Sequence, residues 1–237
     1  MTRIAPLTLA RPSARPPIYY PESDGEPMAE SDLHRHVLIA LLFALEEYYR
    51  TRAEVYIAGD LLIYYEEGNP NVSVAPDVFV VFGIPKGNRE VYKLWEEGRA
   101  PAVVFEITSK STRKRDLADK RMIYEELGVA EYFLFDPLDE YLSPKLQGFR
   151  RQGFFFAPLA PAHLPGEEWE LTSRVLGLKM RTEGQNLRLL DLKTGAKLRT
   201  PAEEAAARQE AEARSQALED ENAYLKAELA RLRGKLQ

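Results

Sequence analysis

The chain has 237 residues, of which 45% are hydrophobic, so it can build one well-buried domain with appendages. It contains no cysteine, which excludes a disulfide framework and a thiolate zinc site. No apolar run has the length of a membrane span or a signal-peptide core, and we therefore expect a soluble cytoplasmic protein with no membrane contact. The formal net charge of −5 differs from that of most nucleic-acid-binding domains, which are basic over the whole fold.

Residues 1–28 are rich in proline, which lacks an amide donor and disfavours helix in the residue before it. We expect this segment to be an extended arm. From Ser31 the pattern changes, because apolar residues recur at spacings of three and four as far as Tyr48. This periodicity predicts a helix that ends at about Arg50 and buries one face.

Short β-rich runs separated by turn residues follow this helix and predict a small mixed sheet. The runs are 55–58, 61–65, 78–82 and 103–108. A second helix is expected over 116–127, with Gly128 as its left-handed cap, before another apolar run at 132–136. Strand, helix and strand at this spacing indicate a crossover unit, so the strands on either side of the second helix should be parallel.

Beyond Pro137, two pairs of runs predict hairpins that extend the same domain, which would span 29–200. The first joins 146–151 to 154–159 around Gly153, and the second joins 174–181 to 187–192 around Gly184.

Residues 201–237 have a helical composition and a heptad pattern of apolar residues, with Asn222 at one a position. The seam residues are Leu218, Asn222, Leu225, Leu229, Leu232 and Leu236. All three pairs from a g position to the next e position have opposite charges, which favours a parallel coiled coil and a homodimer through 211–237. The alternative is a solvated amphipathic helix held by its own i,i+4 pairs.

Two of the apolar runs carry a carboxylate where a buried strand should have none. Asp77 stands at the head of Val78-Phe79-Val80-Val81, and Glu106 lies within Val103-Val104-Phe105-Glu106-Ile107. Burying a charged carboxylate costs several kcal/mol unless a partner compensates it. Because the two lie on adjacent strands, we predict that they hold Mg²⁺, which Mn²⁺ could replace, together with water and the backbone carbonyl of Ile107.

Lys120, in the predicted second helix, is the candidate third catalytic residue. A lysine beside a metal ion can orient and deprotonate a water molecule, or offset charge on a phosphoryl transition state. The segment around it carries an excess of positive charge that could contact DNA phosphates, although a solvated helix face explains such a run equally well. The expected DNA-contacting residues are Lys110, Arg113, Lys114, Arg115 and Arg121.

These motifs resemble the Uma-two family, which belongs to the PD-(D/E)XK nuclease superfamily. The resemblance rests on Pro76-Asp77, the run from Glu106 to Thr112, Asp116, Lys120, Tyr124, Gly128-Val129 and Glu131-Tyr132-Phe133, and extends from about 30 to about 192. It implies an α+β fold with an α/β core, in which a restriction-endonuclease-like mixed sheet is flanked by helices. It also implies a Mg²⁺-dependent endonuclease acting on DNA.

The chain departs from the superfamily pattern at Thr108, where a lysine is expected two residues after the glutamate. The resemblance implies that Lys120 supplies the missing amine from the following helix. It also assigns supporting roles to Glu30 as an auxiliary acid, to Asp116 and to Tyr124. Asp116 has the alternative role of capping the second helix, and Tyr124 that of a core residue or a hydroxyl supporting the lysine.

His34 also matches a family position, but three histidines in the chain form no zinc cluster, and we expect His34 on the helix surface. A different hypothesis for the whole chain is a catalytically lapsed nuclease fold that recruits a partner through its coiled coil. An RNA substrate also stays open, because nothing in the sequence reads a 2′-hydroxyl.

Overall fold

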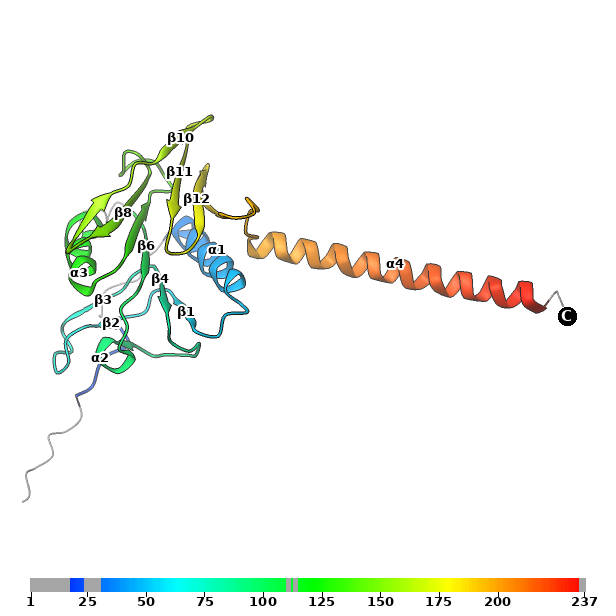
Figure 1. The fold of residues 1–237 in the computed structure, drawn as a ribbon, viewed down its shortest axis with the longest axis horizontal. Coiled ribbons are helices and arrows are strands. Elements are labelled where there is room, and N and C mark those ends of the chain that lie inside the picture. The colour runs from blue at the N-terminus through cyan, green and yellow to red at the C-terminus, as the bar shows by residue number, and fades with distance from the viewer. Residues whose placement is uncertain (1–17, 24–30, 110–111, 113–114, 235–237) are drawn as a thin grey trace, which may run out of the picture.

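The computed structural model describes residues 18–23, 31–109, 112 and 115–234, which form a mixed α+β body and a long projecting helix (Figure 1). The elements of the first half are α1 (Asp32–Tyr48), β1 (Val55–Ala58), β2 (Ile63–Tyr64), β3 (Ser73–Val74), β4 (Val78–Phe82), β5 (Tyr92–Lys93), α2 (Leu94–Glu97) and β6 (Val103–Ile107). A π-helical turn, η1 (Arg115–Asp119), leads into α3 (Lys120–Leu127). They are followed by β7 (Glu131–Phe135), β8 (Leu146–Gln152), β9 (Phe155–Pro158), β10 (Ala162–Leu164), β11 (Glu168–Ser173), β12 (Leu178–Glu183), β13 (Asn186–Asp191) and α4 (Pro201–Gly234).

The central sheet has six strands in the order β1-β4-β6-β7-β8-β9. β6 and β7 are parallel, while the other four neighbouring pairs are antiparallel. The parallel pair is joined through η1 and α3, which confirms the predicted crossover. The predicted α+β class with a mixed sheet flanked by helices is therefore confirmed.

The two faces of the central sheet carry different layers. Val103 and Phe105 pack in one core cluster with α1 and the second sheet, whereas Val104 packs in another cluster with Tyr124 of α3. Since successive side chains of a strand point to opposite faces, Glu106 lies on the same face as Val104, under α3. This alternation decides which helix contacts the glutamate.

A separate four-stranded sheet has the order β10-β11-β12-β13, and a small sheet has the order β3-β2-β5. The predicted hairpin around Gly153 is β8 and β9. The second predicted hairpin is β12 and β13, but its first strand begins at Leu178 rather than at 174, because residues 174–177 form a turn in which Gly177 has φ +69°. The sequence patterns missed β10 and β11.

Part of the expected arm packs against the body. The ring of Tyr20 lies 5.0 Å from that of Tyr64 and 5.2 Å from that of Trp95, and the Tyr64 hydroxyl donates to the carbonyl of Pro21 at 2.6 Å. Residues 18–23 therefore add an aromatic contact to the β2 and α2 region.

Helix α4 leaves the body beside β13 and projects from it (Figure 1). Its first turn is tied to the body because the guanidinium of Arg188, on β13, forms an ion pair with Glu203 at 2.8 Å. In the described part of the chain, no helix combines the length and the apolar character needed to cross a bilayer.

Candidate active site

Asp77 and Glu106 lie opposite each other at one end of the central sheet. Val78 pairs with Phe105 in the antiparallel register of β4 and β6, which places the residue before Val78 beside the residue after Phe105. Both acids are buried, with 9% of Asp77 and 1% of Glu106 exposed. Asp77 Oδ2 accepts a hydrogen bond from the backbone amide of Ile107 at 2.5 Å, so the side chain itself bridges the two strands.

Glu106 receives donors from two residues of α3. The ammonium of Lys120 donates to Oε2 at 2.7 Å, and the hydroxyl of Tyr124 donates to Oε1 at 2.6 Å. Lys120 also donates to the carbonyl of Ala75 at 3.0 Å, just ahead of Asp77. Tyr124 is fully buried in the core, as one alternative predicted, but its hydroxyl contacts the glutamate rather than the lysine.

The lysine reaches the acids because α3 begins at the carboxyl end of β6. Thr108, the position at which the sequence resemblance led us to expect a lysine, is buried, and its amide donates to the carbonyl of Phe135 at 2.7 Å. Burial by itself would lower the pKa of Lys120, but the negative charges of Glu106, Asp77 and Asp116 more than offset this and raise it. Lys120 is therefore a buried cation facing carboxylates.

The prediction that Asp116 caps the second helix is wrong. Asp116 lies in η1, and the N-cap of α3 is Asp119, which makes no side-chain cap hydrogen bond. Asp116 is 1% exposed, and its Oδ1 is 3.7 Å from the Lys120 nitrogen. Burial, followed by the negative charge of Glu106, raises its pKa to about 7.

The prediction of a surface position for His34 is also wrong. His34 is 6% exposed, and its Nε2 is 3.6 Å from Asp77 Oδ2. It lies in the first turn of α1, whose cap is the Ser31 side chain accepting from the His34 amide at 3.1 Å. The sequence contained the signal, because position 34 is in phase with Val37, Leu38 and Leu41, which form the buried stripe of α1.

Four other predicted residues, Glu30, Lys110, Arg113 and Lys114, lie outside the described residues. Arg115 is exposed. Arg121 has contacts within the fold: its guanidinium lies 4.4 Å from the centre of the Phe149 ring and donates to the carbonyl of Phe156 at 3.0 Å.

The charges of the site fit a divalent cation. Three carboxyl groups surround one ammonium, and burial and Glu106 raise the pKa of Asp77 well above its usual range. No group of three or more acidic or histidine residues within the described ranges is arranged to hold a metal. The remaining possibility is a pair of carboxylates supplemented by water. Mg²⁺ commonly binds in this way, so the donor set of Asp77 and Glu106 fits it.

Comparison with known proteins gives two findings. The model of the family Uma2, described as "Putative restriction endonuclease", matches residues 9–183. The match begins within the proline-rich arm and ends before β13, which corrects the expected limits of about 30 and 192. A crystal structure of "a putative nuclease belonging to DUF820" from Anabaena variabilis is similar, with 16% identity, a TM-score of 0.42, and coverage of 61% of this chain and 80% of that one. No curated protein matches the chain.

Proposed function

The chain belongs to the Uma2 family, whose description is "Putative restriction endonuclease", and on this premise we propose that it is a Mg²⁺-dependent endonuclease that hydrolyses DNA phosphodiester bonds. The observation that carries the proposal is the convergence of Asp77, Glu106 and Lys120 from two strands and a helix onto one buried position. An unbalanced acidic cluster of this kind is typical of functional sites, whose groups have shifted pKa values.

In the proposed mechanism, Asp77, Glu106 and the carbonyl of Ile107 would hold the ion, and a bound Mg²⁺ would supply Lewis acidity and an activated water molecule. Lys120 orients the attacking water and offsets the negative charge that develops on the phosphate. Tyr124 fixes the orientation of Glu106 through its hydrogen bond. Asp116, next to the ammonium, positions Lys120.

DNA would approach along the segment that leads into α3. We propose that Lys110, Arg113, Lys114, Arg115 and Arg121 contact the phosphate backbone, with Glu30 as an auxiliary acid near the first helix. The exposed position of Arg115 supports this role most directly.

A homodimer through a parallel coiled coil at 211–237 is part of the proposal. The seam residues Leu218, Leu225 and Leu229 are 51%, 47% and 55% exposed on α4. Pairing two copies would bury these leucines and bring the e and g charges together. Two linked sites would suit cleavage of both strands of a duplex in the cytoplasm.

Cleavage of supercoiled plasmid DNA in Mg²⁺ and in Mn²⁺ tests the proposal. Asp77→Asn and Lys120→Ala should each lose at least about 10³-fold in rate, because each removes several kcal/mol of transition-state stabilisation. Lys193→Ala, which changes an exposed lysine far along the chain, should cleave normally. Undiminished cleavage by both site variants would reject this site, and a parallel assay on RNA separates the two substrates.

One observation favours a second candidate. Both oxygens of Glu106 already accept hydrogen bonds from protein donors, so the site is internally satisfied at that residue. A lapsed nuclease fold that recruits a partner through α4 would have the same geometry. It predicts no cleavage with any divalent metal, and loss of the partner when residues 201–237 are removed.

A further inference from the structure

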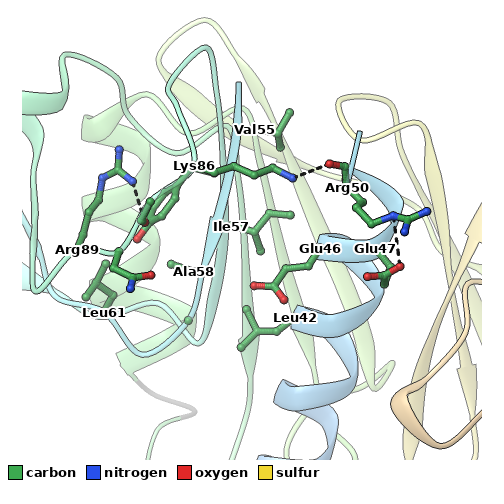
Figure 2. A pocket seen from close by; sticks show the side chains of 14 residues that line it. Leu42, Glu46, Glu47, Arg50, Val55, Ile57, Ala58, Leu61, Lys86 and Arg89 are labelled. Atoms are coloured by element: carbon green, nitrogen blue, oxygen red, sulfur yellow. Dashed lines mark hydrogen bonds and ion pairs between the residues drawn. The ribbon is translucent and has the colours of Figure 1, made fainter. Parts of the chain in front are cut away.

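Strand β1 is an edge of the central sheet, and a groove runs along it (Figure 2). The groove has a volume of about 610 Å³ and lies between the C-terminal half of α1 and the loop 86–89. This volume is in the range of about 300–1,000 Å³ that is usual for ligand sites. Its walls are side chains of the helix and the loop, and its floor is the strand itself.

The backbone of Ile57 faces this groove. The amide of Gly83 donates to the carbonyl of Glu54, and alternate residues of an antiparallel strand bond the same neighbour, so Tyr56 and Ala58 also face β4. Ile57 must then direct its N–H and C=O away from β4. Val80, opposite Ile57, accepts instead from Ala102 on the far side of β4, which agrees with this register.

Lys86 closes one end of the groove, and Gly59 lines the other end. Lys86 crosses the first end and donates to the carbonyls of Tyr49 and Arg50 at 2.9 and 3.2 Å (Figure 2). At the second end, Gly59 packs so tightly that a Cβ would lie 2.4 Å from the carbonyl oxygen of Asp77. The open part of the edge therefore extends from Ile57 to Gly59, beside a proposed metal ligand.

One acidic side chain that lines the groove is left without a partner. Arg50 pairs with Glu47 at 3.8 Å, Arg89 pairs with Glu97 at 2.6 Å, and the ammonium of Lys86 is held by the carbonyls of Tyr49 and Arg50. Glu46 also lines the groove and is exposed, and it makes no ion pair or hydrogen bond with any residue that the structure describes. Lys86 balances Glu46 in formal charge, but its ammonium is already engaged, so Glu46 is the charged group that can pair with a basic side chain of an occupant.

We propose that this groove binds an extended peptide segment of a partner protein, which pairs with Ile57 as a short added strand and places a Lys or Arg side chain against Glu46. Backbone pairing at a sheet edge supplies affinity in this mode, and side-chain contacts supply specificity. The inference does not depend on cleavage activity.

Selection of random heptapeptides displayed on phage, with the full chain as bait, tests the proposal. The selected peptides should share one basic residue, and a synthetic consensus peptide should bind in fluorescence anisotropy. Glu46→Lys should weaken that binding at least 10-fold and should restore it for the peptide whose basic residue is changed to Glu. Glu67→Lys, an exposed charge reversal outside the groove, should bind as the wild type does.

Hydrogen exchange provides a second readout that does not depend on a variant folding. The consensus peptide should protect the Ile57 amide, and N-methylation of the peptide at its pairing position should abolish both protection and binding. Failure to enrich any basic peptide, equal binding to Glu46→Lys, or protection of Ile57 by an oligonucleotide instead of a peptide would each overturn the proposal.

Discussion

Two neighbouring strands of the central sheet each bury a glutamate, and the surroundings of the two differ. Glu131 of β7 is fully buried and accepts from the Arg150 guanidinium at 2.8 Å, the Arg174 amide at 3.1 Å, the Val175 amide at 3.4 Å and the Ser173 hydroxyl. Glu106 of β6 lies in a cluster where Asp77 and Asp116 add negative charge. The ammonium of Lys120 is the positive charge that faces these acids. The carboxylate of Glu131 is matched by protein donors, whereas the cluster around Glu106 has more carboxyl groups than positive charges.

This difference shows that a buried acid in a strand does not by itself identify a functional site. Burial of a carboxylate requires compensation, but the compensation can be structural, as it is for Glu131, which ties β7 to β8 and to the turn after β11. The feature that distinguishes a candidate metal site is an acidic excess that protein donors leave unmatched. Asp116, buried beside a lysine whose ammonium already donates to Glu106, is the clearest sign of this excess.

The largest effect that would separate the two clusters is on stability. Glu131→Ala removes a saturated carboxylate and leaves Arg150 unpaired, so the free energy of unfolding should fall by about 3–5 kcal/mol. Glu106→Gln keeps an acceptor for Lys120 and removes one of three crowded negative charges, so it should change stability far less. Urea denaturation followed by circular dichroism measures both. Equal losses would contradict the distinction between a complete and an acid-rich cluster.

The second effect is on the pH dependence of stability without divalent metals. The pKa of Asp116 is raised from its ordinary 3.8 to about 7, so between these values the folded protein holds a proton that the unfolded chain has lost. Stability should therefore fall as pH rises through this window, by at most about 1.4 kcal/mol per pH unit for this group. Above about pH 7 this contribution is gone.

Asp116→Asn should flatten that slope, although Asp77 keeps part of it, since its pKa is also raised. Urea denaturation between pH 4.5 and 7.5 with a chelator present compares Asp116→Asn with the wild type. An unchanged slope for Asp116→Asn would show that this carboxyl does not titrate in the window.

The third effect is stabilisation by metal. Mg²⁺ at 100 times its Kd should add about 2.7 kcal/mol, which raises Tm by about 5–10 °C in a chain of this size. Glu106→Gln should abolish the shift, because it removes a charged ligand. Thermal melting with increasing Mg²⁺ measures this, and Glu170→Gln, a partly buried acid paired with Lys179 and Arg181, is a control that should retain the shift.

The smallest effects come from removing one hydroxyl in each cluster. Tyr124→Phe and Ser173→Ala each delete a donor to a buried carboxylate, and each should cost about 1.5 kcal/mol. Only Tyr124→Phe should also slow cleavage, since its hydroxyl orients Glu106. A plasmid assay beside a denaturation curve separates the two, and slower cleavage by Ser173→Ala would argue against the assignment of separate roles.

Local patterns predicted much of the fold. The runs at 55–58 and 78–82 are β1 and β4 with the same bounds, and Gly128 caps α3 with φ +83°. In both cases the sequence signal is local, because it comes from the composition of a short run or from a single turn residue. Strands β3 and β5 have only two residues each, too few for any periodicity, and β10 and β11 lacked the apolar alternation that would have marked them.

The residues of the candidate site could be predicted where they lie within or beside a strand or helix that has a clear sequence pattern. Asp77, Glu106 and Lys120 were named from strand and helix patterns and meet in the structure. The burial of His34 was not predicted, although its phase with the apolar stripe of α1 indicated it, and the position of Asp116 was not predicted because it depends on the π-helical turn before α3. The contrast between Glu106 and Glu131 was also hidden, since the partners of Glu131 come from positions 150 and 173–175, distant in sequence.

The π-helical turn η1 sets the spacing between Asp116 and Lys120. Turns of this kind hold more residues than an α-helical turn and often occur at functional positions. Deleting one residue between Asp116 and Lys120 would relax η1 toward an ordinary helix and change their spacing from four residues to three. Side chains three residues apart still lie on one face of a helix, so Asp116 would stay near the Lys120 ammonium. Among relatives, we therefore expect this turn to accept a one-residue deletion more readily than an insertion.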